Sequence, residues 1–397
     1  MALAERTEGL AASPTMAMDA RAKALVRQGV DVISFSVGEP DFDTPEVIKE
    51  AALAAMRRGQ TKYTAVQGLP ELREAVAANL AEELGLDVDP ARIVVSNGAK
   101  QSIFNVLFAL AGPGDEVVVP APYWVSYPEQ IRLAGATPVI VPTRVEEGFH
   151  LDLEALEAAI GPRTRAILLN SPSNPSGAVL GRGELEAVAE LALRHGLWII
   201  SDEIYRHLVF GVEHVSVAQL GPEVRARTVL IDGVSKAYAM TGWRIGWAVA
   251  EDRALVEAMT AIQSHLTSAP STISQWAAVA ALRQAGEAAR AMVEEFDRRR
   301  RRVVELIRRT PGFELPREPE GAFYAFPSIR PLLGRAVAGR QVNDGDDLAE
   351  LLLEEAHVAV VPGAGFGLPE YLRLSYATSL ERIEEGFRRL ASALRVS

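Results

Sequence analysis

The sequence contains no cysteine, which excludes disulfides, thiol catalysis and cysteine-ligated metal sites. It also lacks any apolar run of the roughly 18 residues that a membrane-spanning helix needs. The first residues, MALAERTEGLAASP, include acidic side chains and no apolar stretch of the kind found in secretory signals. These absences predict a cytoplasmic protein that does not enter a membrane.

Positive charge is also in short supply, because the formal net charge is −11 at pH 7. A nucleic-acid-binding protein usually presents a basic face. The one dense basic run, Arg298 to Arg302, lies among glutamates in a helical pattern, which is typical of a solvated helix surface. We therefore expect no nucleic-acid partner.

Lysine is scarce among the basic residues: of the 41, only five are Lys and 36 are Arg. The five are Lys23, Lys49, Lys62, Lys100 and Lys236. Arginine serves wherever only a solvated positive charge is needed, but it cannot lose its proton at working pH. Each remaining lysine is therefore a candidate for a role that needs an amine.

Short apolar runs alternate with amphipathic helical patterns through the middle of the chain. The runs are 93–95, 116–120, 137–141, 165–170, 197–203 and 228–233. Strands that alternate with helices predict a mainly parallel sheet covered on both faces. The chain has 397 residues, of which 48% are hydrophobic, so two or three domains with substantial cores are expected.

The pattern changes towards the C-terminus. Residues 251–308 are predicted to be helical, and after Pro311 four short strand candidates (FELP, GAFYAFP, VAVVP and YLRLSYA) appear together with two helices. This predicts a smaller α+β domain, which the first residues of the chain are expected to join. We place the large domain at 46–290 and the small domain at 1–45 and 291–397.

Polar and aromatic residues follow five of the predicted strands. These segments are SNGAK (96–100), PAPYW (120–124), NSPSNPSG (170–177), SDEIY (201–205) and DGVSK (232–236). Any one of them could be an ordinary turn. Ligands of open α/β sheets bind at the carboxyl ends of the strands, so five such segments in succession predict a shared ligand site. Common phosphate-loop, zinc-protease and nucleophile-elbow motifs are absent from the sequence.

At these motifs the sequence resembles the fold-type I pyridoxal-5′-phosphate (PLP) enzymes, in particular the class-I aminotransferases of the bacterial aspartate aminotransferase type. The matching stretches run in order over nearly the whole chain. They are VGEPDFDTP (37–45), TKYTAVQGLPELREAV (61–76), SNGAKQSIFN (96–105), APYWVSYPE (121–129), NSPSNPSGAV (170–179), SDEIYRHL (201–208), VSKAYAMTGWRIGW (234–247), EGAFYAF (320–326) and LRLSYATS (372–379). Ser173 and Ser176 stand where close relatives often have Asn and Thr.

The resemblance implies PLP as the cofactor. It implies an α/β large domain of the PLP-dependent transferase fold type I, with a mainly parallel seven-stranded sheet flanked by helices, and a smaller α+β domain. It also implies a homodimer with shared active sites, because Tyr63 would reach the cofactor phosphate of the partner subunit. No metal ion is expected.

The same resemblance assigns the chemistry to a few side chains. Lys236 would hold the cofactor as a Schiff base and carry the proton between the substrate Cα and the cofactor. Asp202 would face the pyridine nitrogen and keep it protonated, its alternative being a helix cap. Tyr205 and Asn174 would donate hydrogen bonds to the ring oxygen. Trp124 would stack on the ring, its alternative being an ordinary core residue.

The cofactor phosphate would lie at the start of a helix. Backbone N–H groups of Gly98, Ala99 and Lys100 would form an anion-binding nest there. A hydroxyl from Ser235 and the guanidinium of Arg244 would complete the phosphate site.

Substrate binding would involve residues from several parts of the chain. Arg373 would bind the α-carboxylate in a bidentate manner, and the backbone of Gly38 would approach the substrate closely. Lys100 would bind the second carboxylate of a dicarboxylic substrate, its alternative being a role for the cofactor phosphate only. The expected set comprises Ser13, Thr15, Gly38, Lys100, Trp124, Asn174 and Arg373.

These roles predict an aspartate transaminase, which exchanges an amino group between L-aspartate or L-glutamate and a 2-oxo acid such as 2-oxoglutarate by a ping-pong mechanism. Aromatic or prephenate substrates are an alternative. Another is a different fold-type I activity such as a C–S lyase, because such enzymes share Lys236, Asp202 and Arg373. A ligand-binding transcription regulator built on this fold would need an N-terminal DNA-binding module, for which residues 1–36 are too few.

Overall fold

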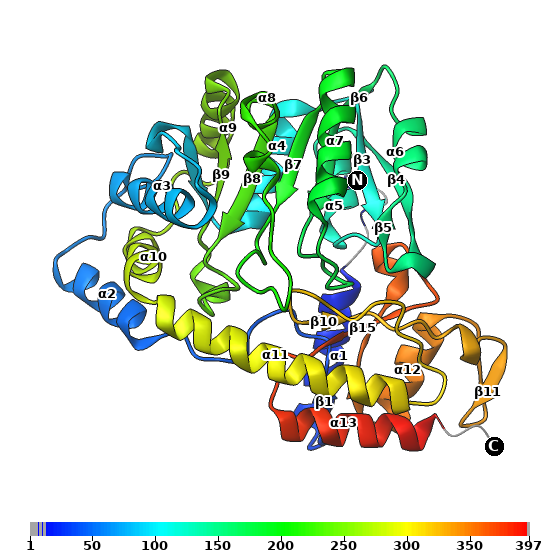
Figure 1. Cartoon of the computed structure of the whole chain (residues 1–397). Coiled ribbons are helices and arrows are strands. Elements are labelled where there is room, and N and C mark those ends of the chain that lie inside the picture. Colours follow the sequence, from blue (N-terminus) through cyan, green and yellow to red (C-terminus); the bar gives the residue numbers. More distant parts are fainter. Residues whose placement is uncertain (1–6, 8–9, 11–12, 395–397) are drawn as a thin grey trace, which may run out of the picture.

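A mixed eight-stranded sheet forms the centre of the larger part of the molecule (Figure 1). This computed structural model describes Thr7, Leu10 and residues 13–394. The strands of the sheet are β2 (Ile93–Ser96), β3 (Glu116–Ala121), β4 (Thr137–Arg144), β5 (His150–Leu151), β6 (Thr164–Asn170), β7 (Trp198–Asp202), β8 (Thr228–Gly233) and β9 (Gly246–Ala250). Their order is β2-β9-β8-β7-β6-β3-β4-β5.

The predicted mainly parallel sheet is confirmed, but the strand count was one too low. Strands β4, β3, β6, β7 and β8 are parallel to one another. At one end β9 is antiparallel to both β8 and β2. At the other end the two-residue β5 pairs antiparallel with β4. A strand this short has no periodicity that a sequence pattern could reveal, so the sheet has eight strands and not seven.

Helices cover both faces of this sheet. They are α2 (Glu46–Arg57), α3 (Pro70–Leu84), α4 (Ala99–Leu110), α5 (Ser126–Leu133), α6 (Leu153–Ala158), α7 (Arg182–His195), α8 (Pro222–Arg225), α9 (Arg253–Leu266) and α10 (Thr272–Gln284). Successive side chains of a strand point to opposite faces. Leu168 and Ile200 accordingly share a core with α4 and α9, whereas Ile167 and Ile199 share one with α7. Burial on both faces explains the continuous apolar runs of the central strands.

The long helix α11 (Gly286–Arg309) leads from the sheet to a smaller α+β unit (Figure 1). This unit contains α12 (Gly345–Glu355), α13 (Leu380–Ala393), β10 (Tyr324–Ala325), β11 (Arg335–Val337), β12 (Arg340–Val342), β13 (Val358–Ala359), β14 (Val361–Pro362) and β15 (Leu372–Ser375). The predicted strand at 313–316 was wrong, because that segment makes only an isolated bridge between Glu314 and Ser328. No helix in the described part of the chain combines the length and the apolar character needed to cross a membrane.

The N-terminal elements α1 (Pro14–Arg27) and β1 (Ile33–Ser34) pack with this C-terminal unit. Strand β1 pairs in parallel with β13, and Met18 and Ile33 share a core with Val358 and Leu390. The proposed domain boundaries stay predictions. The one at 290/291 falls inside α11, and the helical stretch predicted at 251–308 comprises α9, α10 and α11.

Candidate active site

A cavity of about 480 Å³ lies where β6, β7 and β8 end. Residues from all five segments that follow predicted strands contribute to its wall, as do residues of α1 and of the smaller unit. Thirteen of the predicted site residues line it: Ser13, Thr15, Gly38, Ala99, Lys100, Trp124, Asn174, Asp202, Tyr205, Ser235, Lys236, Arg244 and Arg373. The structure therefore brings together nearly the whole predicted set.

Lys236 lies just after β8, with its amine inside the cavity. Its Nζ donates a hydrogen bond to the carbonyl oxygen of Gly38 at 2.7 Å. Burial lowers the pKa of Lys236 to about 8, and the positive charges of Arg244 and Arg373 act in the same direction while Glu39 opposes them. The amine thus reaches its neutral, nucleophilic form more readily than a surface lysine does.

Asp202 ends β7 and is buried. Its Oδ2 accepts a hydrogen bond from the Tyr127 hydroxyl at 2.6 Å, and its Oδ1 accepts one from the Ile204 backbone at 3.2 Å. Burial raises the pKa of Asp202 to about 6, although the Tyr127 hydrogen bond lowers it. A cation facing this carboxylate would favour its charged form. The helix cap considered from the sequence is wrong, because residues 204–207 form a turn and not a helix, and the contact with Ile204 belongs to that turn.

Tyr127 was missed by the sequence reasoning, although a signal existed. It lies three residues after Trp124, a spacing that places two side chains on the same side of a helical turn. The two rings meet edge to face with their centroids 5.4 Å apart. Because the hydroxyl of Tyr127 holds Asp202, the Trp124 segment positions both a cavity wall and the buried carboxylate.

Tyr205 and Asn174 each contact a residue of the smaller unit. The hydroxyl of Tyr205 lies 2.9 Å from that of Tyr324. The side-chain oxygen of Asn174 accepts a hydrogen bond from Arg373 at 3.1 Å, and its backbone N–H donates to Asn170 at 2.8 Å. Tyr324 was also missed, although it lies within the EGAFYAF motif (320–326).

Arg373 is buried in β15. Its Nη2 donates to the carbonyl oxygen of Ser36 at 2.7 Å, and its Nε has no hydrogen-bond partner among the described residues. Its guanidinium carbon lies 4.5 Å from the ring centroid of Tyr324 and 5.2 Å from that of Phe366. Among the residues that the structure describes, no carboxylate pairs with it. A buried charge without a partner is costly, so Arg373 is suited to bind an anion from outside the chain.

The start of α4 offers a site for a phosphate. Its first turn has no acidic residue, and the first backbone N–H groups of a helix have no partner within it. Gly98 precedes it with a φ of +85°, and a Cβ at this position would lie 2.6 Å from Nη2 of Arg244. Arg244 therefore lies directly against the backbone of the helix start. With the amine of Lys236 and the carboxylate of Asp202, these groups fit the phosphate, aldehyde and ring nitrogen of PLP.

Lys100 and two hydroxyls of α1 line the same cavity. The amine of Lys100 lies 4.7 Å from the ring centroid of Trp124. Burial lowers the pKa of Lys100, and the charge of Arg244 adds to this effect. Ser13 accepts a hydrogen bond from the Met16 backbone at 3.4 Å and caps α1, whereas the buried hydroxyl oxygen of Thr15 has no hydrogen-bond partner in the part of the chain that the structure describes. This part of the cavity therefore carries a cation and a free hydroxyl.

Two predicted residues do not line the cavity: Gly98, which lies against Arg244, and Tyr63, which has 94% of its surface exposed. Polar contacts nevertheless hold its segment. Thr272 donates to the carbonyl oxygen of Lys62 at 2.6 Å, and the buried Gln275 bonds both Thr64 (3.2 Å) and the Leu69 backbone (2.7 Å). The aromatic side chain thus projects from a fixed segment.

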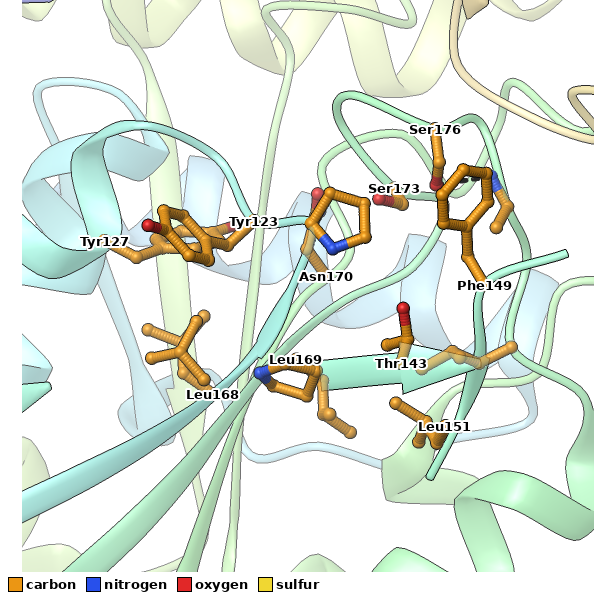
Figure 2. A pocket seen from close by; sticks show the side chains of 15 residues that line it. Tyr123, Tyr127, Thr143, Phe149, Leu151, Leu168, Leu169, Asn170, Ser173 and Ser176 are labelled. Atoms are coloured by element: carbon orange, nitrogen blue, oxygen red, sulfur yellow. Dashed lines mark hydrogen bonds between the residues drawn. The ribbon is translucent and has the colours of Figure 1, made fainter. Parts of the chain in front are cut away.

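A second, smaller cavity of about 40 Å³ adjoins the first and shares Tyr127 and Asn170 with it. Figure 2 shows Tyr123 and Tyr127 on one side of it and Ser173 and Ser176 on the other. Ser173 and Ser176 therefore line this small space and not the main cavity.

Comparison with known proteins places these features in context. The family model described as "Aminotransferase class I and II" matches residues 30–390. Aspartate aminotransferase of Geobacillus stearothermophilus is 46% identical over 98% of each chain. Aspartate/prephenate aminotransferase of Cereibacter sphaeroides is 48% identical over 95% of each chain. The structure of Thermus thermophilus aspartate aminotransferase with maleate superposes with a TM-score of 0.92 at 44% identity, covering 99% of this chain and 100% of that one.

Proposed function

Because the chain belongs to the class I and II aminotransferases, which are PLP-dependent enzymes, we propose that it transfers the amino group of L-aspartate or L-glutamate to a 2-oxo acid such as 2-oxoglutarate. The observation that carries this substrate choice is a cavity with two separate cations for carboxylates, Arg373 and Lys100. A dicarboxylic amino acid needs both, whereas alanine needs only one.

Several contacts support the division of labour between these cations. Arg373 has two nitrogens already turned towards Asn174 and the backbone of Ser36, and it has no carboxylate partner in the described chain. Lys100 stands at the start of α4, where the helix dipole disfavours a cation, so an anionic ligand would compensate it. The related Thermus protein, 44% identical, was solved with maleate, which is itself a dicarboxylate.

The catalytic roles follow from the same geometry. Bound PLP supplies an electron-withdrawing ring that weakens the Cα–H bond of an attached amino acid. Lys236 would hold the cofactor through its amine, and the same amine in its neutral form would take the proton from the substrate Cα as a general base. Asp202 keeps a proton on the ring nitrogen, and Tyr127 holds that carboxylate in place. Tyr205 and Asn174 bind the ring oxygen, and Trp124 covers the ring.

The phosphate is held by the start of α4, with Ser235 and Arg244 beside it. Gly38 leaves room for the substrate and fixes the amine of Lys236 through its carbonyl oxygen. On the distal side, Ser13, which caps α1, and Thr15, in the first turn of α1, donate hydrogen bonds to the second carboxylate of the substrate, beside Lys100.

The working form is a homodimer in the cytoplasm. Tyr63 supports the dimer, because an aromatic side chain with 94% exposure on a segment anchored by Thr272 and Gln275 is suited to enter a second copy. There its hydroxyl binds the cofactor phosphate of the partner. Tyr63→Phe should weaken PLP binding without changing the assembly, as measured by cofactor titration and sedimentation. A fully active monomer would refute the shared site.

The substrate proposal is tested by single half-reactions. The purified holoenzyme is mixed with aspartate, glutamate, alanine or tyrosine, and the change in cofactor absorbance is followed in time. Aspartate and glutamate should react fastest, with the amino group retained on the enzyme until a 2-oxo acid is added. Equal rates for acidic and neutral amino acids would contradict the two-carboxylate cavity, and elimination products such as pyruvate with ammonia would indicate a lyase.

Prephenate is a second candidate acceptor. The observation that favours it is the 48% identical relative named aspartate/prephenate aminotransferase. Adding prephenate to the aminated enzyme and measuring the recovery of the original absorbance tests this directly.

A further inference from the structure

The side chain of Tyr324 stands between two sets of residues with different roles. It belongs to β10, which pairs with β15, the strand that carries Arg373. Its hydroxyl lies 2.9 Å from that of Tyr205, which follows β7 of the large sheet. Its ring centroid lies 4.5 Å from the guanidinium carbon of Arg373. Tyr324 therefore touches both the proposed carboxylate-binding residue and a residue proposed to bind the cofactor.

The position of this hydroxyl is closely defined. Tyr324 is completely buried, and a Cβ at Gly38 would lie 3.0 Å from its oxygen. The same Gly38 accepts the hydrogen bond from Lys236. Gly38 therefore positions the lysine amine through its carbonyl oxygen and leaves space for the Tyr324 hydroxyl. Tyr324 has little freedom to move away from Tyr205.

We propose that Tyr324 is a positioning residue, which directs the hydroxyl of Tyr205 towards the ring oxygen of the cofactor and connects it to Arg373. A phenol has one proton to donate and can accept at its oxygen. When the Tyr205 hydroxyl donates its hydrogen bond to the ring oxygen, the Tyr324 hydroxyl can donate one to the oxygen of Tyr205, and the second hydrogen bond strengthens the first. This inference rests on the proposed role of Tyr205.

Both hydroxyls keep their protons, and either of the two oxygens can be the donor in their hydrogen bond. Burial raises the pKa of both Tyr205 and Tyr324, so both carry their protons at neutral pH. The charged groups that face the pair are Arg373 from β15, Asp202 from β7 and Lys236 after β8, and a further phenol, Tyr376, is near Tyr324. In the described part of the chain, Tyr324 is the hydrogen-bond partner of the Tyr205 hydroxyl.

A double-mutant cycle on the holoenzyme tests the link. The readout is the pH midpoint at which the absorbance of the lysine-bound cofactor changes. Negative charge on the ring oxygen favours the protonated form of the cofactor–lysine linkage. A hydrogen-bond donor at that oxygen offsets this charge and lowers the pKa of the linkage, so a weaker donor raises the midpoint. Tyr324→Phe should raise it by about 0.4–1 pH unit, the equivalent of one hydrogen bond. Tyr205→Phe should raise it more, and adding Tyr324→Phe to Tyr205→Phe should have no further effect.

Tyr371→Phe is the matched control. Tyr371 is also a buried tyrosine of the smaller unit, but it packs on Phe149 and Phe326, so its removal should leave the midpoint unchanged. Cofactor content and thermal midpoint are measured for every variant. If Tyr324→Phe shifted the midpoint equally in the wild-type and Tyr205→Phe proteins, or in neither of them, Tyr324 would not act through Tyr205. The proposed role of Tyr205 would then remain. An unchanged midpoint in Tyr205→Phe would refute that role and the inference with it, while the half-reactions test the aminotransferase activity separately.

The effect of maleate on the pH midpoint tests the proposed connection between Tyr324 and Arg373. As a dianion without an amino group, maleate should raise the midpoint of the wild-type enzyme, because negative charge near the linkage favours its protonated form. Part of this shift should be lost in Tyr324→Phe. An identical maleate shift in the two proteins would show that Tyr324 does not connect Arg373 to the cofactor.

Discussion

Arg206 and Arg373 are both buried, but the regions around them differ in the carboxylates with which each guanidinium can pair. Around Arg206 the chain supplies its own anions, because the guanidinium pairs with Asp232 at 2.7 Å and with Glu83, and it also bonds Asn79. Around Arg373 the described chain supplies carbonyl and amide oxygens and two aromatic rings but no carboxylate.

The difference separates a structural cation from a binding one. The Arg206 region joins α3, the loop after β7 and the end of β8 into one framework. In the described chain the Arg373 charge has no carboxylate partner, which is the arrangement expected of a residue proposed to bind the carboxylate of a ligand. Lys236 and Lys100 share this second condition, since neither has an ion-pair partner in the described chain and burial lowers the pKa of each. The comparison predicts that loss of an unpaired cation affects activity, whereas loss of the paired one affects stability.

The largest effect is expected for Lys236→Ala. The variant should still bind PLP, but transamination should fall by about 10⁴-fold or more, because the proton carrier is gone. Rates of the aspartate half-reaction measure this. Borohydride reduction of the wild-type enzyme should leave the cofactor mass on the peptide that contains Lys236, and attachment at any other lysine would disprove the assignment.

Arg373→Met and Arg206→Met form a direct test of the comparison. Arg373→Met should lower kcat/KM for all amino donors by about 10²–10³-fold, the loss of a buried charge pair worth about 3–4 kcal/mol, with little change in the free energy of unfolding. Arg206→Met should lower the free energy of unfolding by about 3–5 kcal/mol, because the buried carboxylate of Asp232 loses its partner. Urea unfolding and steady-state kinetics distinguish the two. Equal loss of stability in both variants would remove the distinction between them.

A narrower effect is expected for Lys100→Ser. Loss of the distal cation should reduce kcat/KM for aspartate by roughly 10–1000-fold, and much less for alanine or tyrosine. Kinetics with the three donors measure the ratio. Equal losses for acidic and neutral donors would show that Lys100 serves the cofactor phosphate instead.

The smallest effect concerns acid sensitivity of the Arg206 region. Burial alone would raise the pKa of Glu83, but the hydrogen bond with His207 and the charge of Arg206 lower it to about 2. A carboxylate whose pKa is lower in the folded state stabilises the protein above its unfolded pKa of about 4.5, and this contribution is lost as the pH falls towards 2. Glu83→Gln should therefore flatten the decline of the thermal midpoint across that range. The exposed neighbour variant Glu82→Gln should keep the wild-type decline.

The sequence predicted the large sheet and most of the cavity because each strand end carries its own local signal. The residues at 96–100, 170–177, 201–205 and 232–236 follow strands whose apolar runs are continuous, and parallel strands bring their carboxyl ends together. The contacts missed were those made across the fold. The hydroxyl of Tyr324 meets Tyr205 from a two-residue strand of the other unit, and a strand of that length leaves no periodic pattern.

Gly38 is a second case in which the sequence does not identify contacts between distant segments. The sequence predicted that its backbone would approach the substrate closely. The structure adds that a Cβ there would meet the hydroxyl of Tyr324 and that its carbonyl oxygen holds Lys236. A glycine can be recognised as a place where space is short, but the identity of the neighbour depends on how distant segments pack.

The pairing of β1 with β13 has a consequence for how the protein is made. Residues 33 and 34 leave the ribosome early, but their partners at 358 and 359 are synthesised more than three hundred residues later. All strands of the large sheet, together with Asp202 and Lys236, are therefore synthesised before the pairing partner of β1 and before Arg373. A nascent chain that ends before residue 373 therefore already contains Lys100, the proposed partner of the distal carboxylate, but lacks Arg373, the proposed partner of the α-carboxylate. On this proposal, the general ability to bind an amino acid arises later in synthesis than the preference for an acidic one.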